Sequence, residues 1–122
     1  MRWSGMVLVA AVLMPAPAEA MSVAEFLAKA AALRAKGLGA MMAPELKQLR
    51  TEIEGVSAAY RADLTAQRAA GRPVHSCPPP KGKAKIGARE LIGDFQAIPP
   101  AQRGISVKEA FYATMKKRYP CP

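Results

Sequence analysis

The feature that most constrains the fold is an apolar stripe that recurs every three or four residues through the middle of the chain. Its members are Leu46, Leu49, Ile53, Val56, Tyr60 and Leu64. This spacing gathers the side chains on one helical face and leaves the intervening basic residues toward solvent: Lys47, Arg50, Arg61 and Arg68. Pro44 suits the first turn, where its missing N–H has no partner, and Gly71-Arg72-Pro73 ends the pattern. A long helix reaching about Ala70 is therefore predicted.

Gly55 lies inside this predicted helix. A glycine there costs about 1 kcal/mol of helix propensity relative to alanine. Two interpretations stay open: a neighbour packs closely against Gly55, or the helix is locally weak.

A shorter helix is predicted before the long one. Ser22 and Glu25 have the S-x-x-E spacing of a capping box, in which both side chains bind free N–H groups at a helix start. Apolar residues follow at helical spacing, and Gly37 is expected to stop the helix. Residues 37–42 then connect it to the long helix as an antiparallel hairpin.

Two further helices are predicted in the second half. One runs from residue 87 or 88 to 97 and is cut off by Pro99-Pro100. The other begins at a second capping box, Ser106 to Glu109, and ends near Arg118. The residues expected to be buried are Leu91, Ile92, Phe95, Val107, Ala110, Phe111 and Met115.

No segment shows the two-residue alternation of a half-buried strand, so the fold class is predicted to be all-α, a small bundle of about four helices. Residues 21–122 are expected to form one helical domain. Its parts are a helical hairpin (21–71), a Pro- and Lys-rich loop (72–86) and two closing helices (87–122).

The first twenty residues have the three regions of a secretory signal. A positive start (Met1 to Ser4) precedes an apolar run (Gly5 to Met14) and a helix-breaking end in which Ala18 and Ala20 flank Glu19. The ten-residue run is shorter than the roughly 20 residues that a membrane-spanning helix needs. Cleavage after Ala20 is predicted, which places the mature protein in the periplasm or outside the cell.

Cys77 and Cys121 are the two cysteines of the chain. In an oxidising compartment a pair of cysteines is expected to form an intramolecular disulfide. The alternatives are a reactive thiol or an intermolecular bridge, although neither cysteine belongs to a C-x-x-C pair. A disulfide between them closes a loop of 43 residues, for which chain entropy gives an upper figure of about 4 kcal/mol.

The positive charge is uneven: residues 21–75 hold 8 bases and 5 acids, whereas residues 76–122 hold 9 and 3. The second half therefore supplies the candidate partner-binding residues, Lys81, Lys83, Lys85, Arg89, Lys116, Lys117 and Arg118. Export and the lack of aromatics among the bases argue against nucleic acid. An acidic protein, anionic lipid headgroups or an anionic envelope polymer stay open as partners, beside a merely solvated basic surface.

Catalysis is not predicted, and neither a cofactor nor a metal is expected. His75 and Cys77 supply two metal ligands where a structural zinc site has four, so His75 is interpreted as an exposed loop residue beside the disulfide. Glu52 and Glu54 point about 200° apart on a helix and do not form an acid and base pair. The sequence contains no nucleophile elbow, phosphate loop or zinc-protease motif.

The second half contains an ordered set of short motifs over about 45 residues. They are Cys77-Pro78-Pro79, a helix, Ile98-Pro99-Pro100-Ala101-Gln102-Arg103, a helix with Ala110, and Arg118-Tyr119-Pro120-Cys121. This order resembles the C-terminal half of the Rap/Tai-type immunity proteins. The resemblance implies a small exported helical protein that neutralises a peptidoglycan-cleaving amidase effector of type VI secretion. It also implies a Cys77–Cys121 bridge and a structural turn at Pro99, Pro100 and Arg103.

The function predicted from the sequence is therefore that of an exported, non-enzymatic binding protein of the immunity type. A looser resemblance, to periplasmic acid-stress chaperones of the HdeA kind, gives a structural or chaperone role as an alternative. A basic module that binds membrane surfaces is the third hypothesis.

Overall fold

The computed structural model describes residues 20–84 and 86–122. The predicted leader, apart from Ala20, lies outside these residues, and so does Lys85. The elements in chain order are α1 (Val23–Lys36), the 3-10 helix η1 (Gly37–Met42), α2 (Pro44–Ala69), α3 (Ala88–Gln96), the 3-10 helix η2 (Pro100–Gln102) and α4 (Val107–Arg118). The described residues form four α-helices and no strand, which confirms the predicted all-α bundle.

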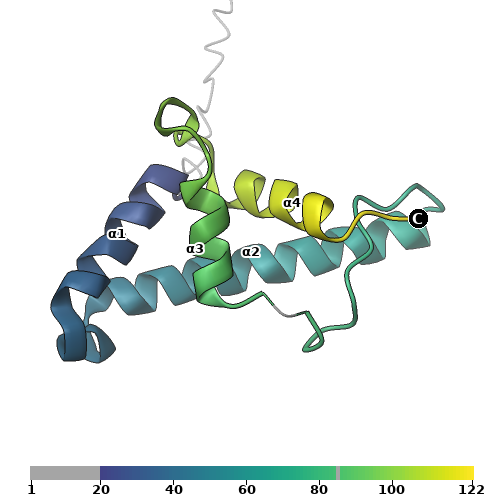
Figure 1. The fold of residues 1–122 in the computed structure, drawn as a ribbon. Helices are drawn as coiled ribbons and strands as arrows, with labels where there is room; N and C mark the ends of the chain where they lie inside the picture. The colour runs from purple at the N-terminus through teal and green to yellow at the C-terminus, as the bar shows by residue number, and fades with distance from the viewer. Residues whose placement is uncertain (1–19, 85) are drawn as a thin grey trace, which may run out of the picture.

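The four helices are arranged around the long helix α2 (Figure 1). α1 and α2 join at η1 and open away from it as a V, in which α3 lies, while α4 runs along the C-terminal half of α2. α1 and α4 pack on α2, whereas α3 packs mainly on α1, where the Phe95 and Phe26 rings meet edge to face with centroids 5.3 Å apart. The molecule therefore has one core, and α2 is its base.

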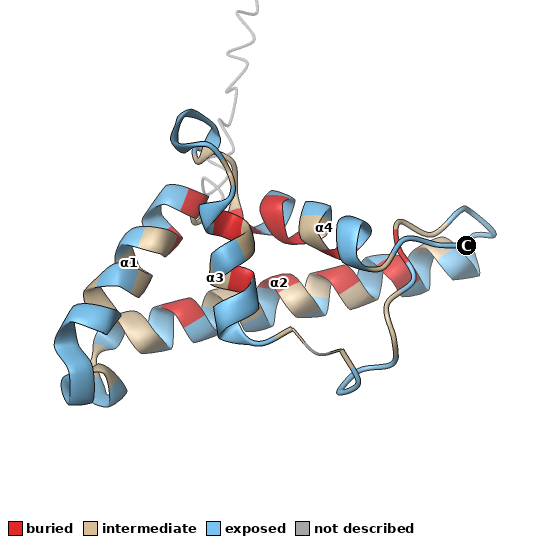
Figure 2. Cartoon of the chain, in the orientation of Figure 1, coloured by how far each residue is buried: buried red, intermediate tan, exposed pale blue. Residues whose placement is uncertain are grey.

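The core contains most of the residues that the helical spacing predicted; the exceptions are Leu46 and Ile53 on α2 and Ile92 on α3, which is also half-buried. The buried hydrophobic residues, which are among those drawn red in Figure 2, are Val23, Phe26, Leu49, Val56, Tyr60, Leu64, Leu91, Phe95, Val107, Ala110, Phe111 and Met115. Leu46 and Ile53 of the α2 stripe are only half-buried, because no helix covers them completely.

The helix ends follow the predicted signals. The Ser22 hydroxyl accepts from the Glu25 N–H at 3.1 Å, and the Ser106 hydroxyl accepts from the Glu109 N–H at 3.0 Å. After α2, the N–H of Arg72 binds the Gln67 carbonyl and the N–H of Gly71 binds the Arg68 carbonyl. This is a Schellman motif, and it requires the positive φ of 67° that Gly71 adopts.

The N-termini of α1 and α4 are joined to each other. Ser22 and Ser106 form an antiparallel bridge in which the Val23 N–H binds the Ile105 carbonyl and the Val107 N–H binds the Met21 carbonyl, both at 2.9 Å. These bonds satisfy backbone donors that helix starts leave free. They also fix the point from which the two helices diverge over α2.

Arg103 occupies the turn between α3 and α4, as the resemblance implied. Its Nε donates to the Ile98 carbonyl at 2.9 Å, and its second guanidinium nitrogen donates to the Gln96 carbonyl at 2.8 Å. Pro99 and Pro100 precede it, and Pro100 begins η2. The guanidinium thus binds carbonyls at the C-terminal end of α3 and holds the turn.

Within residues 20–84 and 86–122, none of the helices combines the length and the apolar character needed to cross a membrane.

Gly55→Ala is expected to stabilise the protein by about 1 kcal/mol, because a Cβ at Gly55 would meet no atom within 4 Å and alanine is the better helix former. This result excludes the first of the two interpretations of Gly55, in which a neighbour packs closely against it. Urea denaturation measures the change. Gly71→Ala is the matched control, and its positive φ should make the same substitution destabilising by about 1 kcal/mol. A loss of stability in Gly55→Ala would contradict the assignment.

Arg103→Met is expected to lower the free energy of unfolding by about 2 kcal/mol, because it removes two hydrogen bonds from a charged donor and keeps the aliphatic stem. Arg103→Lys should recover little of this loss, since an ammonium does not reproduce the two-pronged geometry. Thermal unfolding of both variants tests this, with Arg68→Met on the exposed side of α2 as the control. Equal stability of Arg103→Met and wild type would refute the role of the guanidinium.

Candidate functional site

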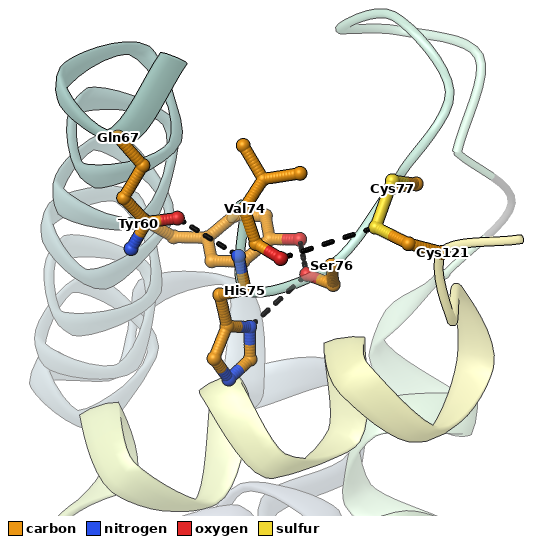
Figure 3. The surroundings of a disulfide bond; sticks show 7 residues. All are labelled: Tyr60, Gln67, Val74, His75, Ser76, Cys77 and Cys121. Atoms are coloured by element: carbon orange, nitrogen blue, oxygen red, sulfur yellow. Dashed lines mark hydrogen bonds between the residues drawn. A yellow bond between two sulfur atoms is a disulfide. The ribbon is translucent and has the colours of Figure 1, made fainter. Parts of the chain in front are cut away.

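The predicted disulfide between Cys77 and Cys121 is present (Figure 3). The two Cα atoms lie 5.0 Å apart, although the residues are 44 positions apart in the chain. Beside the bond, the Cys77 N–H donates to the Tyr119 carbonyl at 2.8 Å. The disulfide therefore ties the segment that follows α2 to the segment that follows α4.

A hydrogen-bonded network lies next to the disulfide, on the inner side of residues 74–77 (Figure 3). Ser76 is completely buried, and its hydroxyl binds the hydroxyl of Tyr60, which comes from α2. His75 Nδ1 lies 3.1 Å from the same Ser76 oxygen, and the backbone N–H of His75 donates to Gln67 Oε1 at 2.8 Å. The network anchors the segment before Cys77 onto α2.

The interpretation of His75 as an exposed loop residue is wrong. The side chain is half-buried, and its ring meets the rings of Tyr60 and Tyr112 edge to face, with centroids 6.3 and 5.6 Å away. The spacing of residues in the chain did not indicate this contact, because Tyr112 belongs to α4 and Tyr60 to α2.

Tyr112 links α4 to α2 on the same side of the molecule. Its hydroxyl donates to Asp63 Oδ2 at 2.5 Å. Burial raises the pKa of Tyr112 far above its ordinary value, and the hydrogen bond to the Asp63 carboxylate raises it further. The hydroxyl therefore stays protonated and acts as a donor over the whole physiological range.

Replacing both cysteines by alanine is expected to lower the free energy of unfolding by up to about 4 kcal/mol, because the closed loop no longer restricts the unfolded chain. Urea denaturation of the double variant and of the wild type under dithiothreitol should give matching midpoints. Midpoints equal to that of the oxidised wild type would show that the bond adds no stability.

The candidate basic residues of the loop that the structure describes lie on a turn. Residues 76–79 form neither a helix nor a turn, and the chain then turns at residues 81–83, where the Lys83 N–H binds the Pro80 carbonyl at 2.9 Å. Lys81 and Lys83 are exposed on this turn, and Arg89 is exposed in the first turn of α3. Gly82, in the middle of this turn, has a φ of 87°.

The basic residues at the end of α4 are exposed, and one of them has an intramolecular partner. Lys116 and Lys117 face solvent, whereas Arg118 binds both carboxylate oxygens of Asp94 on α3, with Nε 2.8 Å from Oδ2. This ion pair is about one-third exposed. Arg118 thus connects α4 to α3 and is less available to a partner than the two lysines.

An apolar groove of about 560 Å³ lies between α1, α2 and α3, and we call it the interhelical groove. Its apolar floor includes Leu33, Leu46, Ile53, Ile86 and Ile92, all of them half-buried. The groove exists because α3 packs on α1 and leaves the N-terminal half of α2 incompletely covered.

Charged residues at the groove are mostly positive: Arg34, Arg50 and Arg61, with Glu54 as the acidic member. Arg50 is exposed on α2. Arg61 was expected in solvent but is half-buried, with its guanidinium 3.1 Å from the Pro79 carbonyl and 6.0 Å from the centre of the Tyr60 ring. The groove thus combines an apolar floor with a positive rim.

The sequence did not reveal this groove. Leu46 and Ile53 fit the helical stripe as well as the buried members do, so the pattern alone assigned them to the core. The one available signal was length, because the stripe on α2 extends past the span that a single short helix can cover.

Within the described ranges no group of three or more histidine, cysteine, aspartate or glutamate side chains is placed to hold a metal ion. No family model, curated protein or solved structure matches the chain.

Proposed function

We propose that the protein is an exported, non-enzymatic binding protein of the immunity type, which holds a cell-wall-degrading effector at the interhelical groove. The observation that carries this proposal is the groove itself, an apolar floor with an arginine rim on a disulfide-closed scaffold. The motifs that resemble the Rap/Tai-type proteins support the choice of an amidase-type effector as the partner.

The size and chemistry of the groove define what it would accept. A volume of about 560 Å³ is in the range of ligand pockets and suits one loop or helix end of a partner protein. Apolar anchors seated in a pocket supply most of the affinity of a protein interface. A partner segment with an apolar side chain beside an acidic one would match both the floor and the arginines of the rim.

The motif residues themselves stabilise the scaffold. Cys77 and Cys121 form the disulfide, and Arg103 binds carbonyls at the end of α3. Side chains committed to these bonds hold the helices in place. Partner recognition is therefore assigned to residues outside the motifs, those of the groove.

An oxidising compartment fits this proposal. The chain begins with the features of a secretory signal, and its two cysteines are joined. Peptidoglycan, the substrate of such effectors, lies in the same compartment. We therefore place the mature protein in the periplasm or outside the cell.

Arg50→Glu is expected to weaken inhibition of an amidase-type effector encoded beside the gene by about tenfold or more, because it puts a negative charge on the rim that should meet an acidic segment. Peptidoglycan hydrolysis at increasing concentrations of the exported protein is the measurement. Arg68→Glu makes the same change on the same helix, away from the groove, and should inhibit like wild type.

Two results would count against the proposal. If the wild-type protein neither binds nor inhibits the effector, the immunity function is refuted. If Arg50→Glu and Arg68→Glu inhibit equally well, the effector does not bind at the groove. Suppression of client aggregation after an acid shift, in place of inhibition, would favour the chaperone alternative.

A further inference from the structure

The connection between α1 and α2 exposes three large apolar side chains. Leu38 is 97%, Met41 76% and Met42 90% exposed to solvent. They belong to η1, whose six residues form the outer end of the helical hairpin, far from the C-terminus (Figures 1 and 2). We call residues 37–42 the apolar tip.

The apolar tip is a folded element and not a loose loop. Residues 37–42 form a continuous 3-10 helix, and the Ala43 N–H closes it by binding the Ala40 carbonyl at 3.2 Å. Gly37, with φ of 54°, turns the chain out of α1 immediately before the exposed side chains. The three apolar side chains are therefore held in solvent by a defined backbone.

Positive charge surrounds the apolar tip. Arg34 and Lys36 lie in the last turn of α1, and Lys47 and Arg50 lie in the first two turns of α2, all four exposed. Glu45 is the acidic residue of this region. Its carboxylate accepts from Lys36 Nζ at 2.9 Å, and this bond holds the pKa of Glu45 below its usual value.

We propose that the apolar tip is a membrane-docking site that inserts Leu38, Met41 and Met42 into the surface of an anionic phospholipid bilayer. Arg34, Lys47 and Arg50 would then contact lipid phosphates. Exposed apolar side chains next to basic ones are the chemistry by which peripheral proteins lie at a bilayer interface. This site is separate from the groove in its ligand, although Arg34 and Arg50 border both.

A membrane fits the tip better than a protein partner or a second copy of the chain. A specific protein interface uses about 20–30 residues on each side, whereas the tip has 6 residues. A bilayer has no such requirement, because it surrounds any apolar side chain that enters it. The excess of arginine and lysine around the tip also matches the negative potential of anionic lipids.

Flotation of the exported, oxidised protein with vesicles tests the proposal. We expect binding to vesicles that contain phosphatidylglycerol, and weaker binding to phosphatidylcholine alone. The combined variant Leu38→Ser, Met41→Ser and Met42→Ser should bind at least tenfold less tightly, because each apolar side chain contributes to insertion. Its thermal unfolding should match wild type, since the three side chains contact little of the protein.

Charge variants separate the apolar tip from the general basic surface. Lys47→Ala with Arg50→Ala should weaken binding about tenfold and reduce its dependence on salt between about 0.1 and 1 M. Lys116→Ala with Lys117→Ala removes as much charge at the end of α4 and should bind like wild type. Equal losses in the two pairs would overturn the assignment to the tip and favour diffuse attraction.

A single tryptophan reports insertion directly. Trp3 is the one tryptophan of the sequence and lies in the predicted leader, so Leu38→Trp gives the processed protein one fluorophore. Its emission should shift to the blue on phosphatidylglycerol vesicles and be quenched by brominated acyl chains. Ala101→Trp, an exposed position in η2, should show neither change.

Three results would overturn the proposal. They are an unshifted Leu38→Trp emission on vesicles, full binding by the triple serine variant, and a wild-type dimer in sedimentation that the triple variant loses. The last result would make a second copy the occupant of the tip. Failure to inhibit an effector would not affect these measurements, because they contain no effector.

Discussion

Burial of the apolar face of α2 is the interaction on which the rest of this structure depends. α2 has 26 residues and is about 39 Å long, whereas α1 with 14 and α4 with 12 residues are about 21 and 18 Å long. Neither short helix covers the long one alone. α1 and α4 therefore start from a common point, the bridge between Ser22 and Ser106, and cover opposite halves of α2. α3 fills the space between α1 and the centre of the molecule.

The two halves of α2 are covered unequally. The C-terminal half is well packed, whereas the N-terminal half leaves apolar surface accessible. Over the C-terminal half, α4 packs closely on α2, and Tyr60 of α2 binds the buried Ser76. The disulfide joins the segment that follows α2 to the segment that follows α4. Over the N-terminal half, α1 diverges from α2 in a V. Leu46 and Ile53 stay half-buried there and form the floor of the groove. The apolar tip is at the far end of the same open half.

Both proposed interactions therefore lie in the part of the molecule with the least internal packing. The disulfide and the turn at Arg103 stabilise parts of the fold away from the apolar tip. A protein that is well packed at one end can expose apolar surface at the other end and still stay folded. At the proposed periplasmic location, a tip on the membrane would hold the groove close to the bilayer, next to the cell wall that the proposed effector would attack.

The sequence by itself determined the helices and most members of the core, because a helix repeats every 3.6 residues and its ends carry local signals such as Ser22, Ser106 and Gly71. It also determined the disulfide partners, since two cysteines allow one pairing. Only the tertiary structure decided that His75 packs against two tyrosines, that Arg118 pairs with Asp94, and that Leu46 and Ile53 remain half-buried. These outcomes depend on the angles at which helices distant in the chain cross α2, and residue spacing along one helix carries no information on those angles.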